Sequence, residues 1–237
     1  MEPRLAITPQ NNQAFLREVD EELRRDQAML FWTRYGRWII GAVVLALAIF
    51  AGVLFWQSQQ QKKAGEQGEK LSTIFEKLGI GDEKAATPLL TDMAGNGIGG
   101  YRSLAKFTQA DVLLQKNDLK GAAAKFAEIA NDTGAAQPFR DLALIRQTYA
   151  EFDTLKPQTV VDRLKPLAVK GSPWFGSAGE LVAVAYLQQR KNREAGALFG
   201  QIARDQDVPE SLRQRAVQMA GVLGVDAVDQ VEENKPQ

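Results

Sequence analysis

The residues that most often carry catalysis and metal binding are largely missing from this sequence. Its 237 residues include no cysteine and no histidine, which excludes disulfides, thiol nucleophiles, histidine-based triads and Cys/His zinc sites. Carboxylates, lysines, serines and tyrosines remain, and a membrane-bound enzyme that uses a cluster of them is the alternative, but the sequence reveals no such cluster. We therefore predict no catalytic, cofactor-binding or metal-binding residues, no small-molecule substrate, and a protein that is not an enzyme.

Two short motifs resemble chemical sites. Residues 95–100 read GNGIGG, but they lack the Lys-Ser/Thr pair of a phosphate-binding loop and follow no predicted strand. We interpret them as a hinge. Asp205-Gln206-Asp207 lacks the glycine and the distal glutamate of a calcium loop. Neither motif predicts a ligand.

Charge and composition narrow the class of protein. The chain has 29 basic and 29 acidic residues, and no part of it is basic enough to indicate a nucleic-acid partner. With 45% hydrophobic and 24% charged residues, it is typical of a folded chain with a core. The hydrophobic pattern of the sequence then indicates which segments form helices or strands.

The strongest hydrophobic signal is residues 38–56, WIIGAVVLALAIFAGVLFW, which carry no charge. A helix of this length spans roughly 28 Å, close to the ~30 Å hydrocarbon core of a bilayer. Trp38 and Trp56, at its two ends, suit the membrane interfaces. We predict one transmembrane helix, with these two tryptophans as its membrane-anchor residues.

The orientation of this helix follows from its place in the chain. Four basic residues precede the apolar run within fifteen positions and three follow it, so the charge difference is small. A single apolar segment near the amino terminus behaves as a signal-anchor, and the long downstream part is translocated. The sequence after Trp56 lacks an A-x-A-like cleavage site. We expect an uncleaved anchor with the amino terminus inside.

The rest of the chain divides around this anchor, and it shows a helical period with no strand pattern. Residues 1–37 form a cytoplasmic tail with an amphipathic helix, which is either solvated or in contact with the membrane or a partner. Residues 57–100 form a stalk and a first irregular hairpin, 101–224 form the repeat domain, and 225–237 form a disordered tail. The predicted fold class is all-α.

An internal repeat organises residues 101–224. Leu113–Asp132 aligns without gaps on Tyr186–Asp205, an offset of 73, and a weaker hairpin lies midway. A unit of 34–38 residues with two helices is tetratricopeptide-like, and such hairpins stack into an α-solenoid. An irregular helical bundle is the alternative. Pro166, within the weaker hairpin, predicts that its helix kinks or ends there.

The first helix of each hairpin should supply the concave surface of the stack. Its polar members are candidate contacts for a partner, although a solvated face is the alternative: Arg102, Lys106, Gln109, Arg146 and Glu180. The aromatic residues on the same helices have packing spacings, and we expect them in the core: Tyr101, Phe107, Phe139, Tyr149 and Trp174.

The stretch YRSLAKFTQADVLLQKNDLKGAAAKF (residues 101–126), with the upstream FLREVDEELRRD and RYGRW, resembles the YfgM-type family of proteobacteria. That family is described as an ancillary subunit of the SecYEG translocon, and it has no catalytic residues. The resemblance implies a single-pass inner-membrane protein with a cytoplasmic amino terminus and a periplasmic carboxy-terminal domain. The glycine-rich residues 95–100 depart from the family pattern.

Together these features predict a membrane-tethered adaptor for protein–protein interaction. The resemblance implies the SecYEG translocon as a partner, with periplasmic chaperones or nascent secretory chains bound by the repeats. The alternative is a scaffold or assembly factor for another envelope complex, such as outer-membrane biogenesis or division machinery. The repeat framework predicts the fold, and its variable surface determines the partner.

Overall fold

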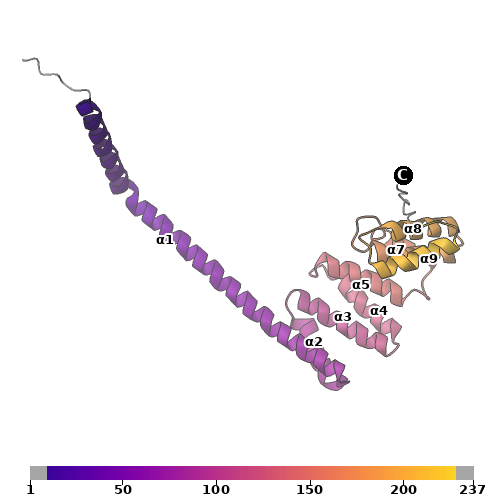
Figure 1. Ribbon diagram of the computed structural model, residues 1–237. Coiled ribbons are helices and arrows are strands. Elements are labelled where there is room, and N and C mark those ends of the chain that lie inside the picture. The colour runs from indigo at the N-terminus through magenta and orange to yellow at the C-terminus, as the bar shows by residue number, and fades with distance from the viewer. Residues whose placement is uncertain (1–9, 228–237) are drawn as a thin grey trace, which may run out of the picture. The chain divides into compact units, whose positions relative to one another are not determined.

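The computed structural model describes residues 10–227, and within that range all regular structure is α-helical (Figure 1). The predicted all-α class is therefore confirmed. The chain divides after Lys63 into two compact units, and helix α1 (Gln10–Gly79) contributes to both. Side chains of most of the first turns of α1, where an amphipathic face was predicted, lie outside the described residues.

In the first unit, α1 carries the apolar run. It is the one stretch among the described residues that is long and apolar enough to cross a membrane. None of that stretch is buried within the chain, whereas the core helix of a water-soluble domain would be mostly covered. Trp38 is 71% exposed and Trp56 is 66% exposed. The length, apolar composition and exposure of this helix make it a candidate membrane span.

The second unit consists of the end of α1 and eight further helices (Figure 1). From α2 onward, consecutive helices pack against each other, and the end of α1 shares a hydrophobic cluster with α2 and α3. The helices are α2 (Glu83–Asn96), α3 (Gly100–Gln115), α4 (Leu119–Ala130), α5 (Gln137–Ala150), α6 (Pro157–Leu164), α7 (Phe175–Gln188), α8 (Asn192–Arg204) and α9 (Glu210–Val222).

The 73-residue repeat is present in the backbone. Asn117 and Arg190, 73 positions apart, are the two non-glycine residues of the described chain with positive φ, at 59° each. Each ends a helix by the same turn. The next amide, of Asp118 or Lys191, donates to the carbonyl five residues earlier at 2.9 Å. Such a left-handed turn satisfies carbonyls that the helix leaves open.

Two glycines extend this series to the ends of the stack. Gly81, after α1, has φ 80°, and Gly224, after α9, has φ 76°. In each case the following amide again donates to the carbonyl five residues back, at 2.8 and 2.9 Å. The end of α1 and the whole of α9 therefore occupy the same place in the repeat as α3 and α7. This odd-numbered set of helices alternates with α2, α4, α6 and α8.

The core is built by large residues between helices that small residues bring close together. Phe126 and Phe199, again 73 apart, are 0% and 1% exposed. Ala110 and Ala183, which occupy equivalent places on α3 and α7, are fully buried. Four hydrophobic clusters follow one another along the unit, and each draws on neighbouring helices. No hairpin buries its apolar face alone, so the stack is the stable unit.

Two interruptions of the helical pattern that the sequence predicts, at Pro166 and within residues 95–100, coincide with helix ends in the structure. Helix α6 ends at Leu164, two residues before Pro166, whose nitrogen carries no hydrogen to donate to a carbonyl of the preceding turn. Within GNGIGG, α2 ends at Asn96 and α3 begins at Gly100. A Cβ at Gly97 would lie 2.4 Å from the carbonyl oxygen of Met93, so this turn requires glycine.

The packed chain continues beyond the predicted boundary of the carboxy-terminal tail. Val225 packs against α8, where Gly196 and Gly200 leave a flat surface for it. Ala227 is 5% exposed and belongs to the same cluster. The predicted disordered segment therefore does not begin at 225, and its remainder, 228–237, lies outside the described residues.

Phe126→Ala and Phe75→Ala provide a matched test of the stacked core. Phe126 is fully buried and Phe75 is 50% exposed. Removing the buried ring leaves a cavity, so Phe126→Ala should lower the free energy of unfolding by about 3–5 kcal/mol. Phe75→Ala should cost less than about half of that, because its ring keeps much of its contact with water. Urea unfolding of the full chain in detergent, followed by circular dichroism, measures both. Equal losses would contradict this description of the core.

Candidate interaction groove

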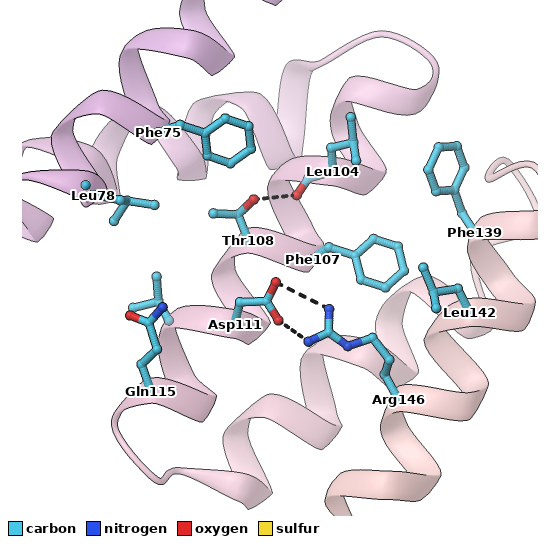
Figure 2. Close-up of a pocket in the computed structure, with 12 residues that line it drawn as sticks. Phe75, Leu78, Leu104, Phe107, Thr108, Asp111, Gln115, Phe139, Leu142 and Arg146 are labelled. Carbon is cyan, nitrogen blue, oxygen red and sulfur yellow. Dashed lines mark hydrogen bonds and ion pairs between the residues drawn. The ribbon is translucent and has the colours of Figure 1, made fainter. Parts of the chain in front are cut away.

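The odd-numbered helices of the second unit line two adjoining cavities. The first has a volume of about 510 Å³ and lies among the end of α1, α3 and α5 (Figure 2). The second, of about 900 Å³, is lined mainly by α5, α7 and α9. Arg146 of α5 lines both, so the two cavities adjoin at this residue, and we call them together the groove.

Large apolar side chains are exposed in the groove. Phe75 and Leu104 line the first cavity and are 50% and 38% exposed. Leu119 and Tyr149 line the second and are 44% and 70% exposed. Exposed apolar residues scattered singly over a surface need no explanation, but a contiguous group of them marks an interaction site. Half of the exposed large apolar residues in the described part of this unit lie in the groove.

The charges in the groove are largely paired with one another. Both terminal nitrogens of Arg146 donate to the carboxylate of Asp111 on α3, and its guanidinium lies 4.7 Å from the centre of the Phe126 ring (Figure 2). Arg215 of α9 donates to both oxygens of Glu180 on α7, at 2.9 and 2.8 Å. These hydrogen bonds raise the pKa of Arg215 further above its ordinary value.

Both ion pairs join successive odd-numbered helices, from α3 to α5 and from α7 to α9. In addition, the Phe107 and Phe139 rings of α3 and α5 lie 6.4 Å apart. The pairs hold the groove walls together and remove most of the net charge from its floor. What remains available to a ligand is mainly apolar and aromatic surface. The groove thus suits a peptide segment better than a charged small molecule.

Two of the five predicted contact residues, Arg146 and Glu180, line the groove, where each is engaged in an ion pair. The other three, all on α3, do not line either cavity. Arg102 donates to the carbonyl of Gly97 at 3.3 Å, and Lys106 pairs with Asp132 of the α4–α5 turn at 3.2 Å. Gln109 is half-buried.

Another stripe of α3 faces the groove, and it contains Leu104, Phe107, Thr108 and Asp111. These residues follow the three-to-four spacing of one helix face, which is the signal that could have identified them. Figure 2 shows the side chain of Thr108 donating to the carbonyl of Leu104 on this stripe. The expectation that Tyr149 belongs to the core was wrong, since its ring is 70% exposed in the groove. Phe107 is buried, as expected.

The charged side chains of the groove lie mainly in ion pairs. Among the residues that the structure describes, no group of three or more acidic side chains could hold a metal ion. The carboxylates in the groove, other than Asp153, are bound to arginines rather than to one another. Such an arrangement can bind, but it offers no activated nucleophile and no proton donor beside a reacting group.

The pair of Lys106 and Asp132 predicts a specific pH dependence. The hydrogen bond from Lys106, and then that from the backbone of Gly134, lower the pKa of Asp132 below 3.8. A lowered folded-state pKa contributes stability above the unfolded-state value, and the contribution is lost as the pH falls through the folded-state value. Asp132→Asn should therefore flatten the decline in unfolding free energy below pH 3.8.

Lys106→Met should produce a similar flattening, because it removes the main cause of the shift. When the two substitutions are combined, the effect should be smaller than the sum of the single ones. Urea unfolding across the acidic range measures these differences. Additive effects would show that the two side chains do not interact.

Comparison with known families agrees with this geometry. The sequence profile of the tetratricopeptide repeat-like domain matches residues 30–220, which is most of the chain. No curated protein and no solved structure matches it. Domains of this type are typically non-enzymatic scaffolds that bind other proteins. Because the match includes the apolar helix as well as the stacked hairpins, the chain belongs to the tetratricopeptide repeat-like domain family.

Proposed function

We propose that this protein is a membrane-tethered adaptor whose groove binds segments of other proteins. The observation that carries the proposal is the group of exposed apolar side chains in the groove, beside charges that are already paired. A partner segment with apolar side chains would gain from covering Phe75, Leu104 and Tyr149. It would not need to break the Asp111–Arg146 or the Glu180–Arg215 ion pair.

The apolar helix would anchor this adaptor in the membrane. A membrane anchor confines the repeat domain to a thin layer, which raises the effective concentration of any partner that is also at the membrane. Weak binding in the groove is then sufficient for function, and release remains rapid.

For the partner, we propose the SecYEG translocon, with nascent secretory chains or periplasmic chaperones in the groove. The resemblance of residues 101–126 and of the amino-terminal tail to the YfgM-type family supports this assignment. Chains that leave a translocon are unfolded and expose apolar side chains, which is the chemistry that the groove would accept. The anchor would hold the groove near the point of exit.

For the topology, we propose a cytoplasmic amino terminus, one inner-membrane span at residues 38–56, and a periplasmic repeat domain. The support is the position of the single apolar run near the start of the chain. The slight excess of arginine before it agrees with this orientation. The lack of cysteine is compatible with an oxidising compartment.

Photocrosslinking in native membranes tests the partner. A benzoylphenylalanine placed at Tyr149 or Leu104 should crosslink to translocon subunits or to secretory chains, because both side chains are exposed in the groove. Ala124 on α4 and Ala197 on α8 are exposed on even-numbered helices and serve as matched controls. Recovery of outer-membrane assembly or division proteins instead would contradict the translocon assignment. Equal crosslinking from the controls would contradict the groove.

Single cysteines test the topology. The natural chain has none, so one introduced cysteine is a unique label. Ser72→Cys, at an exposed position of the second unit, should react with a membrane-impermeant maleimide applied to spheroplasts. Gln10→Cys should react only after the membrane is opened. The opposite pattern would reverse the proposed orientation.

A further inference from the structure

A smaller cavity lies where α7 and α9 begin, and it has a volume of about 390 Å³. It is formed by the turn before α7 and the turn between α8 and α9, and we call it the loop pocket. Trp174 lines it, together with the carboxylate residues Asp205 and Asp207. It contains no lysine or arginine. Its lining therefore combines two aromatic residues, Trp174 and Phe175, with two negative charges.

Asp205 is the unusual member of this lining, because it is only 7% exposed. Its Oδ1 accepts a hydrogen bond from the backbone N–H of Asp207 at 2.9 Å. No described residue donates to Oδ2, and no described lysine or arginine forms an ion pair with this carboxylate. A carboxylate that is buried to this extent is normally paired with a cation, because burial removes most of the water that would solvate its charge.

The internal repeat shows what such a pairing looks like in this chain. Asp132 lies 73 positions before Asp205 and forms the same turn, with its Oδ1 accepting from the N–H of Gly134 at 2.9 Å. There, the ammonium of Lys106 reaches Oδ2 at 3.2 Å. The charge of Arg102 also acts on this carboxylate and contributes to its lowered pKa. The first copy of the motif therefore carries its own cations.

In the second copy of the repeat, neither equivalent position carries a cationic residue. The offset of 73 places Gly179 where Lys106 stands and Phe175 where Arg102 stands. A Cβ at Gly179 would also lie 2.9 Å from Cδ1 of Ile202, so a lysine there would require the Ile202 side chain to move. The turn and its carboxylate are retained, while the cations that neutralise it in the first copy are not.

We propose that the loop pocket binds a lysine or arginine side chain presented by a protein partner. The ammonium or guanidinium would take the position that Lys106 holds beside Asp132, donating to the free Oδ2 of Asp205. Asp207 adds a second negative charge at the rim, and it is exposed. The indole of Trp174 offers the aromatic surface that most favours a cation.

The chemistry of the lining favours an organic cation over a metal ion. A divalent metal ion is held by several oxygen ligands, and no described group of three acidic side chains could supply them. An aromatic wall adds nothing to metal binding, but it favours a cationic side chain with an apolar stem.

The loop pocket and the groove share Ser177 and Leu212 in their linings, so one bound chain is able to reach both. The inference does not depend on the groove, however, because short peptides suffice to test it.

Trp174 provides the readout. The chain has four tryptophans, at positions 32, 38, 56 and 174, and replacing the first three by phenylalanine leaves Trp174 as the sole reporter. This full-length variant, in lipid nanodiscs, is titrated with N-acetyl-Gly-Arg-Gly-amide and with its lysine analogue at constant ionic strength. The matched control peptide carries citrulline, which has nearly the shape of arginine but no charge. Both cationic peptides should change the fluorescence saturably, and the citrulline peptide should not.

Asp205→Asn should weaken binding of the cationic peptides by about tenfold or more. Asparagine keeps an acceptor oxygen for the N–H of Asp207, so the turn should be preserved while the charge is lost. Asp207→Asn, at an exposed position, should weaken binding to a smaller extent without any effect on folding. Asp132→Asn is the matched control in the first copy and should leave binding unchanged.

Several results would overturn the proposal: equal binding of the citrulline peptide, no effect of Asp205→Asn, or no saturable signal from any peptide. Binding of Ca²⁺ or Mg²⁺ that displaces the peptides would identify a metal site in its place. Failure of the groove crosslinks would leave this test unaffected, because Asp205 does not line the groove.

Discussion

The fold depends on one constraint, which is that a two-helix hairpin in this chain cannot cover its own apolar face. Phe126 and Phe199 become buried only because another helix closes over each of them. Buried alanines such as Ala110 and Ala183 allow that close approach. Every hairpin therefore needs a neighbour, and the stack, the groove and the turns that carry the loop pocket all follow from this requirement.

The same requirement explains why the two faces of the stack differ. The even-numbered helices pack against the odd-numbered ones on both sides, while the odd-numbered helices also meet one another through Asp111–Arg146 and Glu180–Arg215. Half-exposed pairs of this kind contribute little to stability. Their larger effect is on the surface, because charges that bind each other leave the apolar side chains around them free for a partner.

Most of the fold could be predicted from the sequence, since helix ends coincide with local signals. Asp118 caps α4, Pro157 opens α6 and Pro166 follows its end. The site was harder to predict. Periodicity shows that α3 is helical, but several of its sides touch neighbouring helices, so the pattern does not tell which stripe faces the groove. Lys106 is directed to Asp132 by a turn 26 residues away, and no local signal reports that contact.

Five odd-numbered helices, from the end of α1 to α9, form one row in the described part of the chain, and left-handed turns end four of them. Packed helices lie about 8–10 Å apart, so the row from the end of α1 to α9 extends over roughly 35 Å. An extended chain advances about 3.3 Å per residue, and about ten residues would cover that distance. The number of repeats thus sets how long a polypeptide the domain is able to cover at one time. That length corresponds to one short unfolded segment rather than to a whole folded protein.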